Sequence, residues 1–263
     1  MSSHEEKQVE KKVRLQSQTI YGIIAREGNE ELARPLSSLA WSGVAAGICI
    51  CFSIFTQAFL TKYLPEGGGF VLIEKMGYVA GFLIVVLARL QLFTEHTITV
   101  ILPLLDKLSW RNLNKTLKLW GVVFAANMVG TFLIAFILTH MELPSESYMT
   151  ILTDISMHAV DKPFAEVFIM GIPAGFLITV MVWMMPSAKG AEFLVIFFMI
   201  YLIALGDFSH VVAGSFEAFF VAFTGDISWQ AALMYILGAG LGNILGGTGI
   251  FTLLAYAQVK NEI

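Results

Sequence analysis

Seven ionisable side chains lie inside long apolar stretches of this sequence: Arg89, Glu95, His96, Glu166, Asp207, His210 and Glu217. A charge in the bilayer interior is expensive, so such residues face a cavity or one another and mark the path of an ion, a proton or a polar substrate. Two short segments, 94–96 and 207–210, hold four of the seven. The residue types therefore indicate passage of a small solute through a membrane.

His210 is the strongest candidate for a central role. Burial disfavours the charged form of an imidazole, so we expect a neutral ring at rest and a protonated one when an anion arrives. Thr94 and Ser209 place hydroxyls in the same two segments. A hydroxyl there can cap the following helix, or it can bond to the imidazole or the substrate, and both roles stay open.

Three large apolar side chains flank these hydroxyls and are candidates for constrictions that strip water from a solute, with plain packing as the alternative: Leu92, Phe93 and Phe208. Arg89, Glu95 and Asp207, together with Glu166, are expected to form a buried charge network, because an isolated buried charge is expensive. Structural ion pairs are the favoured interpretation of this network, ahead of a clamp for the substrate.

Six apolar stretches must position these residues. Of the 263 residues, 57% are hydrophobic and only 14% are charged, too few to cover a soluble domain. Crossing the hydrocarbon layer takes roughly 20 helical residues, and stretches long enough lie at 36–61, 76–105, 119–141, 163–185, 191–223 and 229–259. Backbone groups in lipid must bond within their own segment. We therefore predict an all-α membrane protein with six transmembrane helices.

The second and fifth stretches are interrupted, and their interruptions resemble each other. Phe93-Thr94 matches Phe208-Ser209, and each pair is followed by an Asn-x-x-Gly motif that begins at Asn127 or Asn243. The spacing is 34 residues from Phe93 to Asn127 and 35 from Phe208 to Asn243. Three spans per half make the halves enter from opposite sides. We predict an inverted repeat, 36–141 against 163–259, with discontinuous second and fifth helices; breaks that serve only packing are the alternative.

Small and amide side chains are expected at the helix crossings. Asparagines bond across helices and glycines let backbones approach, which assigns Asn127, Asn243 and Gly246 to packing. Residues 1–35 hold six Lys and Arg residues, and the connection after the second stretch holds four. The positive-inside rule then places both termini in the cytoplasm. This divides the chain into a cytoplasmic arm (1–35), a six-span channel domain (36–259) and a cytoplasmic tail (260–263).

The sequence argues against an enzyme. Ser209 and His210 are adjacent, and adjacent residues on a helix do not face each other. The chain has neither a G-x-S-x-G nor an H-E-x-x-H motif. Cys49 and Cys51 have no thiols or histidines nearby that would suggest zinc. We expect no catalytic residues, no metal and no cofactor.

Several motifs resemble the formate/nitrite transporter family. The segment Gly206-Asp207-Phe208-Ser209-His210-Val211-Val212-Ala213 is similar to the family's signature at its second helix break. Leu92-Phe93-Thr94 resembles its first break, 242–247 its last span, and 163–185, which contains Glu166, its fourth. The resemblance covers about residues 25–258. Gln91, Ser209 and Gly175 depart from the residues of formate channels, which makes the chain more similar to the divergent YfdC-like branch.

The resemblance implies an aquaporin-like bundle and a homopentamer with one pore per protomer in a bacterial cytoplasmic membrane. It implies transport of formate, nitrite or a related monovalent anion, proton-linked if His210 shares a proton. The family's central histidine corresponds to His210, its loop threonine to Thr94, and its slit residues to Leu92, Phe93 and Phe208. The expected partners are the anion and lipid, not nucleic acid. A pore for water or another neutral solute is the alternative, although the Asn-Pro-Ala motifs of aquaporins are absent.

Overall fold

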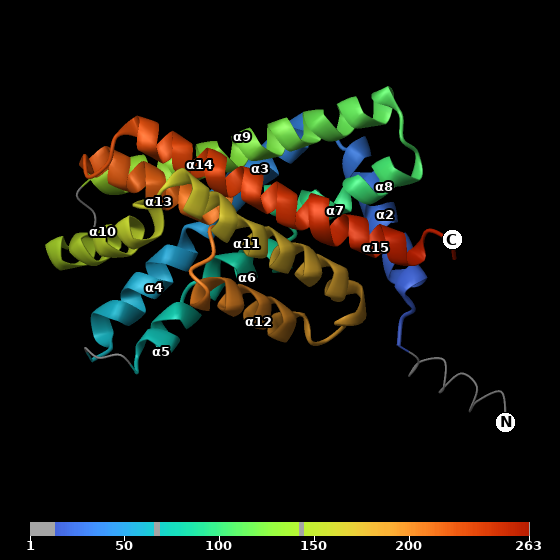
Figure 1. Ribbon diagram of the computed structural model, residues 1–263. Coiled ribbons are helices and arrows are strands. Elements are labelled where there is room, and N and C mark those ends of the chain that lie inside the picture. Colours follow the sequence, from blue (N-terminus) through green and yellow to red (C-terminus); the bar gives the residue numbers. More distant parts are fainter. Residues whose placement is uncertain (1–13, 66–68, 142–144, 263) are drawn as a thin grey trace.

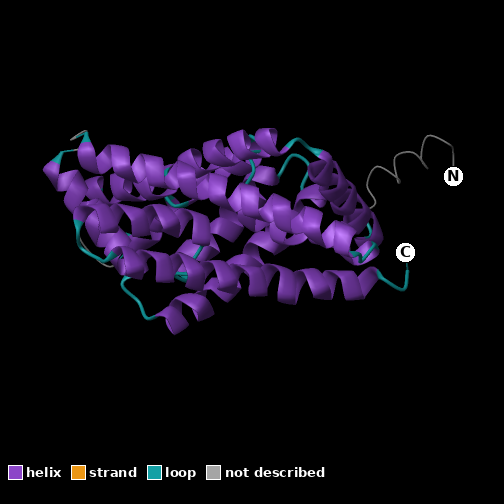
Figure 2. Cartoon of the chain, turned by 90° about the horizontal axis from the view of Figure 1, so that it is seen from above, coloured by secondary structure: helices purple, strands orange, loops and turns teal. Residues whose placement is uncertain are grey.

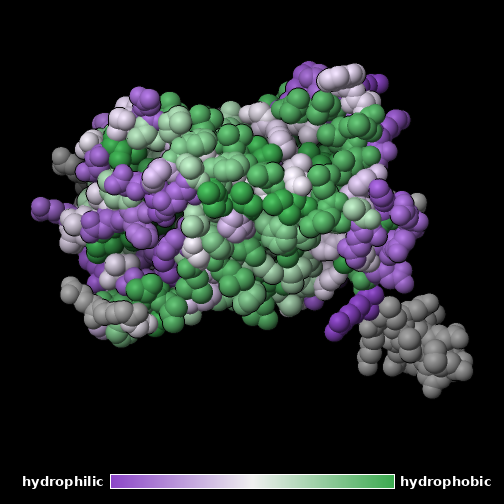
Figure 3. All heavy atoms as spheres, viewed as in Figure 1, coloured by the Kyte–Doolittle hydropathy of each residue, from purple (hydrophilic) through white to green (hydrophobic). Residues whose placement is uncertain are grey.

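The structure is a computed structural model that describes residues 14–65, 69–141 and 145–262, and within these ranges it contains helices and no strands (Figures 1 and 2). Four helical stretches are long and apolar enough to cross a membrane: Leu36–Tyr63, Trp110–His140, Phe164–Ser187 and Trp229–Val259. Hydrophobic side chains cover the middle of the face shown in Figure 3, and hydrophilic ones gather at its two ends. The chain is therefore an all-α protein with membrane-spanning helices, as predicted.

The long stretches follow the predicted ranges closely. The first comprises α3 (Leu36–Ile50) and α4 (Phe52–Tyr63), and the last comprises α14 (Trp229–Ile244), a π-helical segment (Leu245–Thr252) and α15 (Leu253–Val259). Between them lie α9 (Trp110–His140) and α11 (Phe164–Met184). α9 begins before the predicted start because Ser109 caps it, its hydroxyl accepting the Asn112 N–H at 3.2 Å.

The other two predicted spans are divided into short pieces. The earlier one comprises α5 (Val71–Met76), α6 (Val79–Leu87), a 3₁₀ turn (Phe93–Glu95), α7 (His96–Thr99) and α8 (Ile101–Asp106). The later one comprises α12 (Glu192–Leu205) and α13 (Val211–Thr224), both apolar but shorter than a full span. The breaks fall at 88–92 and 206–210, so the second contains the predicted segment 207–210, whereas the first ends just before the predicted Phe93-Thr94.

Helices α6 and α12 end in the same backbone motif. Arg89 and Asp207 have φ of +54° and +48°, a left-handed conformation. After them, the Leu90 N–H bonds to the Val85 carbonyl at 3.0 Å, and the Phe208 N–H bonds to the Ile203 carbonyl at 3.1 Å. The left-handed residues bond three positions back, at 3.1 and 3.3 Å. These are two Schellman motifs, each with a side chain where glycine is usual.

Asn127 and Asn243 hold the two breaks through matching hydrogen bonds. Asn127 Oδ1 accepts the Phe93 N–H at 2.9 Å, and its Nδ2 donates to the carbonyls of Gln91 and Gly43, both at 2.8 Å. Asn243 repeats this arrangement with three partners at 2.9, 2.8 and 2.8 Å: the Val211 N–H and the carbonyls of Ser209 and Gly171. Both side chains are fully buried. The two asparagines do more than the predicted packing, because they satisfy backbone groups that the breaks leave open.

These bonds correct the register predicted between the two halves. Asn127 bonds to Gln91 where Asn243 bonds to Ser209, so Gln91 is the counterpart of Ser209. Thr94 is therefore the counterpart of Val212, not of Ser209 as predicted. The sequence match followed similar side chains, whereas the register is set by backbone geometry.

Glycines allow the long helices to cross closely. α3 packs on α9, and α11 packs on α14 and the π-helical segment. A Cβ on Gly47 would lie 2.3 Å from the Asn127 carbonyl oxygen, and one on Gly246 would lie 1.9 Å from the Ile172 carbonyl oxygen. Backbones therefore touch at both crossings, as expected for Gly246.

Two further helices mark the ends of the bundle (Figure 1). α2 (Ser17–Ala33) lies beside α15, α7 and α8 and buries Tyr21 and Ile24. α10 (Glu146–Val160) lies against α4 and α13 at the other end. None of the six predicted stretches includes α10, although its buried residues recur every fourth position from Tyr148 to Val160. These are called the α2 end and the α10 end below.

Candidate functional site

Two cavities reach into the bundle, one lined by residues of α10 and the other by residues of α2. The α10 cavity has a volume of about 410 Å³ and is lined by residues of α10. The buried residues Ser209, His210 and Glu217 also line it. The α2 cavity, about 510 Å³, is lined by residues of α2 and reaches Gln91 and His96. The two cavities share no lining residue. Each helix break therefore contributes to a separate cavity.

His210 and Thr94 are joined by a hydrogen bond between the two breaks. Nε2 of His210 lies 2.8 Å from the Thr94 hydroxyl, with both side chains buried. On the other side of the ring, Nδ1 accepts the Ala213 N–H at 3.3 Å and caps α13. Since Nδ1 accepts, Nε2 carries the hydrogen of the neutral ring and donates it to Thr94. The Thr94 hydroxyl thus keeps its own hydrogen to donate elsewhere.

α6 runs from one cavity to the other along a single face. Tyr78 lines the α10 cavity, and Val86, two turns later, lines the α2 cavity. Phe82 lies between them, fully buried, with its ring centroid 4.9 Å from that of His210. α12 packs on α6 and also contributes to both cavities, with Ile200 fully buried. An apolar layer therefore separates the cavities.

The three predicted constriction residues occupy different surroundings. Phe208 lines the α10 cavity. Leu92 is fully buried and lines neither cavity. Phe93 packs edge-on against Trp120 and Phe124 of α9, with ring centroids 5.6 and 5.0 Å away. Phe82 was not among the predicted constriction residues, but its ring packs edge-on against that of His210.

The predicted buried charge network does not form. Arg89 lies 3.6 Å from Glu27 of α2, with its side chain 77% exposed. Asp207 forms an ion pair with Lys75 of α5. Arg89 and Asp207 line different cavities, so they cannot pair with each other. The sequence showed their charges but not that an apolar layer lies between them.

The other two members of that network are also separate. Glu166 is exposed on α11 and forms no ion pair with the described residues. Glu95 lines the α2 cavity, and its Oε1 is buried with no hydrogen-bond partner among the described residues. Burial without a partner distinguishes Glu95 from the exposed carboxylates.

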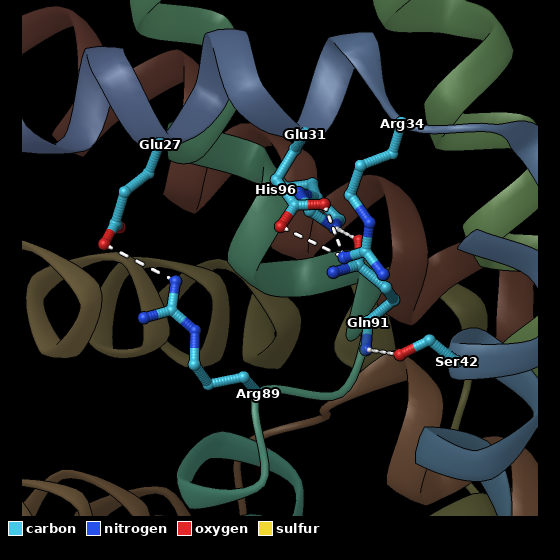
Figure 4. A network of polar contacts seen from close by, with 7 residues as sticks. All are labelled: Glu27, Glu31, Arg34, Ser42, Arg89, Gln91 and His96. Carbon is cyan, nitrogen blue, oxygen red and sulfur yellow. Dashed lines mark hydrogen bonds and ion pairs between the residues drawn. The ribbon is translucent and has the colours of Figure 1, made fainter. Parts of the chain in front are cut away.

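The wall of the α2 cavity carries a polar network (Figure 4). Nε2 of His96 lies 2.8 Å from Oε1 of Gln91, and the Gln91 N–H donates to the Ser42 hydroxyl at 3.1 Å. Glu31 of α2 pairs with Arg34 at 3.0 Å. The described residues contain no cluster of His, Cys, Asp or Glu that could hold a metal ion.

Comparison with known proteins agrees with this geometry. The model of a family described as formate/nitrite transporter matches residues 18–257. The chain is 36% identical to the Inner membrane protein YfdC of Escherichia coli (strain K12), over 98% of this chain and 86% of that protein. It is 27% identical to the Formate channel FocA of Haemophilus influenzae, over 70% of this chain and 66% of that protein.

A solved structure has the same fold. A pentameric formate channel with formate bound superposes with a TM-score of 0.72 at 22% identity, covering 86% of this chain and 98% of the channel. The family match and the relative in E. coli both span most of the chain. The chain therefore belongs to the formate/nitrite transporter family, and it is a membrane transport protein rather than an enzyme.

Proposed function

We propose that this protein is a channel or transporter for a small monovalent anion of a weak acid, such as formate or nitrite, with His210 and Thr94 at its centre. The observation that carries the proposal is the 2.8 Å hydrogen bond between these side chains. It links the two helix breaks beside the apolar layer that separates the cavities. The relative and the solved structure whose names specify formate support this substrate class.

The Thr94 hydroxyl is the donor available to the anion. It accepts from Nε2 of His210, so its own hydrogen can point to a carboxylate or nitrite oxygen. Phe82 beside the imidazole keeps the surroundings apolar. A hydrogen bond to an anion is strong where water is excluded. The pair thus replaces part of the hydration that the anion loses.

Proton linkage follows if the anion draws a second proton onto the imidazole. That proton would join Nδ1, whose present partner is the Ala213 N–H at 3.3 Å. This bond is longer than most N–H contacts of its kind, so it is the contact of the ring that opens most readily. A shared proton would let the species in the apolar layer be the neutral acid. Ser209 lines the α10 cavity beside this point.

The architecture proposed for transport has six spans. The two divided spans join the four long helices, and the halves 36–141 and 163–259 form an aquaporin-like inverted repeat. The matching bonds of Asn127 and Asn243 support the repeat. Residues 1–35 would form a cytoplasmic arm and 260–263 a cytoplasmic tail. The arm's first 13 residues lie outside the described ranges. Because α2 lies beside α15, the arm and the tail would be on the same side of the membrane.

The setting proposed is a homopentamer in a bacterial inner membrane. The relative in E. coli is named an inner membrane protein, and the solved formate channel is named pentameric. Each protomer would hold its own path, because both cavities described above belong to a single chain. The expected surroundings are lipid, and the expected ligand is the anion alone.

Flux in proteoliposomes tests the proposal. The full-length protein is compared with His210→Asn and His210→Ala, using formate, nitrite, hydrosulfide, acetate and chloride in turn. We expect selective flux of one or more weak-acid anions in the wild type. In both variants we expect either no flux or flux that no longer depends on pH. His140→Asn is the matched control, because His140 is exposed at the end of α9.

The alternatives give different results. Water or urea flux without any anion flux would identify a pore for neutral solutes. Equal chloride and formate flux would contradict the weak-acid specificity. Anion flux that is indifferent to both His210 changes would contradict the central role of the histidine.

A further inference from the structure

Two consecutive residues in the wall of the α2 cavity have buried polar atoms without partners. Nδ1 of His96 and Oε1 of Glu95 make no hydrogen bond with the described residues, and His96 is only 4% exposed. Both residues line the α2 cavity. Buried polar atoms are nearly always bonded, so unpartnered ones call for an explanation. Neither residue takes part in the function proposed above.

The hydrogen bond on the far side of the His96 ring defines its chemistry. Nε2 lies 2.8 Å from the amide oxygen of Gln91, which only accepts, so Nε2 carries the hydrogen of the neutral ring. Nδ1 is then a free lone pair. The backbone of Gln91 is held in turn by Ser42 (Figure 4) and by Asn127. The ring is therefore a base in a fixed orientation.

Charged side chains of both signs line the cavity around His96. Four carboxylates and two basic side chains line the cavity, from α2, the end of α6, the turn before α7 and the start of α12: Glu27, Glu31, Glu95 and Glu192 with Arg89 and Lys189. Arg34 adds a third positive charge but is bonded to Glu31. Carboxylates that can accept a hydrogen bond therefore line the same cavity as His96.

The position of His96 complements that of His210. Thr94, which bonds to His210, is two residues before His96 in the chain. His210 lines the α10 cavity and His96 lines the α2 cavity. The apolar layer with Phe82 lies between the cavities. A solute that crosses as a neutral acid therefore finds a histidine at each face of this layer.

We propose that His96, assisted by Glu95, is a second proton-exchange site, which receives the proton of the weak acid when it enters the α2 cavity. This rests on the proposed function of weak-acid transport. The O–H bond of the acid breaks, its proton joins Nδ1 of His96, and the bonding electron pair stays on the anion. The imidazolium then gives the same proton to solvent, so no other reactant is needed. In the reverse direction His96 protonates the anion before it crosses.

His96→Gln is the direct test. Glutamine can still donate to Oε1 of Gln91 but cannot take up a proton. Two preparations of vesicles, one with the α2 side facing the bath and one with it facing the lumen, contain the full-length protein and a fluorescent pH indicator and are given formate. We expect formate-driven proton movement to slow by about tenfold or more in His96→Gln and to lose its dependence on the pH at the α2 side. His140→Gln should match the wild type.

Glu95→Gln separates the carboxylate from the imidazole. It keeps the size of the side chain and removes the carboxyl group, so we expect slower proton movement with a pH dependence that persists, because that dependence belongs to His96. Unchanged rates and pH profiles in both His96→Gln and Glu95→Gln would overturn the proposal.

A measurement without transport distinguishes failure of this proposal from failure of the proposed function. In wild-type protein labelled with ¹⁵N-histidine, the His96 signals are those missing from His96→Gln. Protonation of Nδ1 as the bath is acidified would support the exchange site even if no weak acid crosses. Signals that stay neutral until the protein unfolds would overturn it even if formate flux is normal.

Discussion

Arg89 and Asp207 hold the same place in two equivalent helix-ending turns, but they carry opposite charges and line different cavities. Each has a left-handed backbone, and each lies two residues before the residue whose carbonyl an asparagine binds. The shared backbone geometry ends α6 at Leu87 and α12 at Leu205. The charges pair locally, Arg89 with Glu27 and Asp207 with Lys75. The left-handed backbone of each residue therefore ends a helix, whereas its charge pairs with a neighbouring side chain in its own cavity.

Substitutions at Arg89 test the backbone requirement. Arg89→Gly and Arg89→Val both remove the charge and the contact with Glu27, but only glycine adopts a left-handed backbone without strain. We expect Arg89→Val to be less stable than Arg89→Gly by about 1–2 kcal/mol. Thermal unfolding in detergent measures the difference. Equal stability of the two variants would show that the left-handed turn is not retained.

Thr94→Val tests the central hydrogen bond. Valine has nearly the shape of threonine but cannot accept the Nε2–H of His210, which leaves a buried donor unpaired. We expect a loss of about 1–3 kcal/mol in stability and a strong loss of anion flux. Thr94→Ser keeps the hydroxyl and should restore most of the flux. If Thr94→Val transports like wild type, the hydroxyl is not part of the path.

Asn127→Ala and Asn243→Ala test the anchoring of the breaks. Each change leaves one N–H and two carbonyls of the buried backbone without this partner. At about 1–3 kcal/mol for each unsatisfied group, both variants should unfold at a much lower temperature. Asn112→Ala is the control, because Asn112 makes its bond to Lys107 at the surface. Similar melting temperatures for all three would contradict the anchoring role.

Gly246→Ala tests the close helix crossing. The new Cβ would lie 1.9 Å from the Ile172 carbonyl oxygen, which is backbone and cannot move aside alone. We expect a loss of at least about 1–3 kcal/mol from overpacking. Gly121→Ala in α9 is the matched control, since nothing lies within 4 Å of its added Cβ. Alanine there should be neutral or stabilising by up to about 1 kcal/mol, as measured by thermal unfolding.

Tyr21 should make the docking of α2 sensitive to strongly alkaline pH. Burial, then the hydrogen bond to Asp106, raises the pKa of the Tyr21 phenol above its usual value. Because the pKa of Tyr21 is higher in the folded state, the stabilisation of the folded protein by the neutral phenol is complete below the unfolded pKa of about 10. It is lost as the pH rises toward the folded pKa. The difference in melting temperature between wild type and Tyr21→Phe should therefore be constant near neutrality and shrink above about pH 10. A difference that changes between mildly acidic and neutral pH would contradict this assignment.

The sequence was informative about the elements and poor about their contacts. Apolar length alone predicted the four long helices, and the polar interruptions located both breaks. The register between the halves was wrong by three residues, because Phe-Thr and Phe-Ser look alike whereas Gln91 and Ser209 do not. The recurrence from Tyr148 to Val160 could have revealed α10. Nothing in the sequence showed that Phe82 lies against His210.

The sequence by itself determined that this chain is an all-α membrane protein of a transporter family, because hydrocarbon thickness and the expense of buried charge leave a direct pattern in residue order. Only the tertiary structure decided which polar groups meet. His210 and Thr94 are 116 residues apart in the chain, and Asn127 and Asn243 bond to the backbone of the breaks that carry them. Arg89 and Asp207 remain apart because apolar side chains fill the space between the cavities. Such pairings depend on packing in three dimensions, which residue types and spacing do not encode locally.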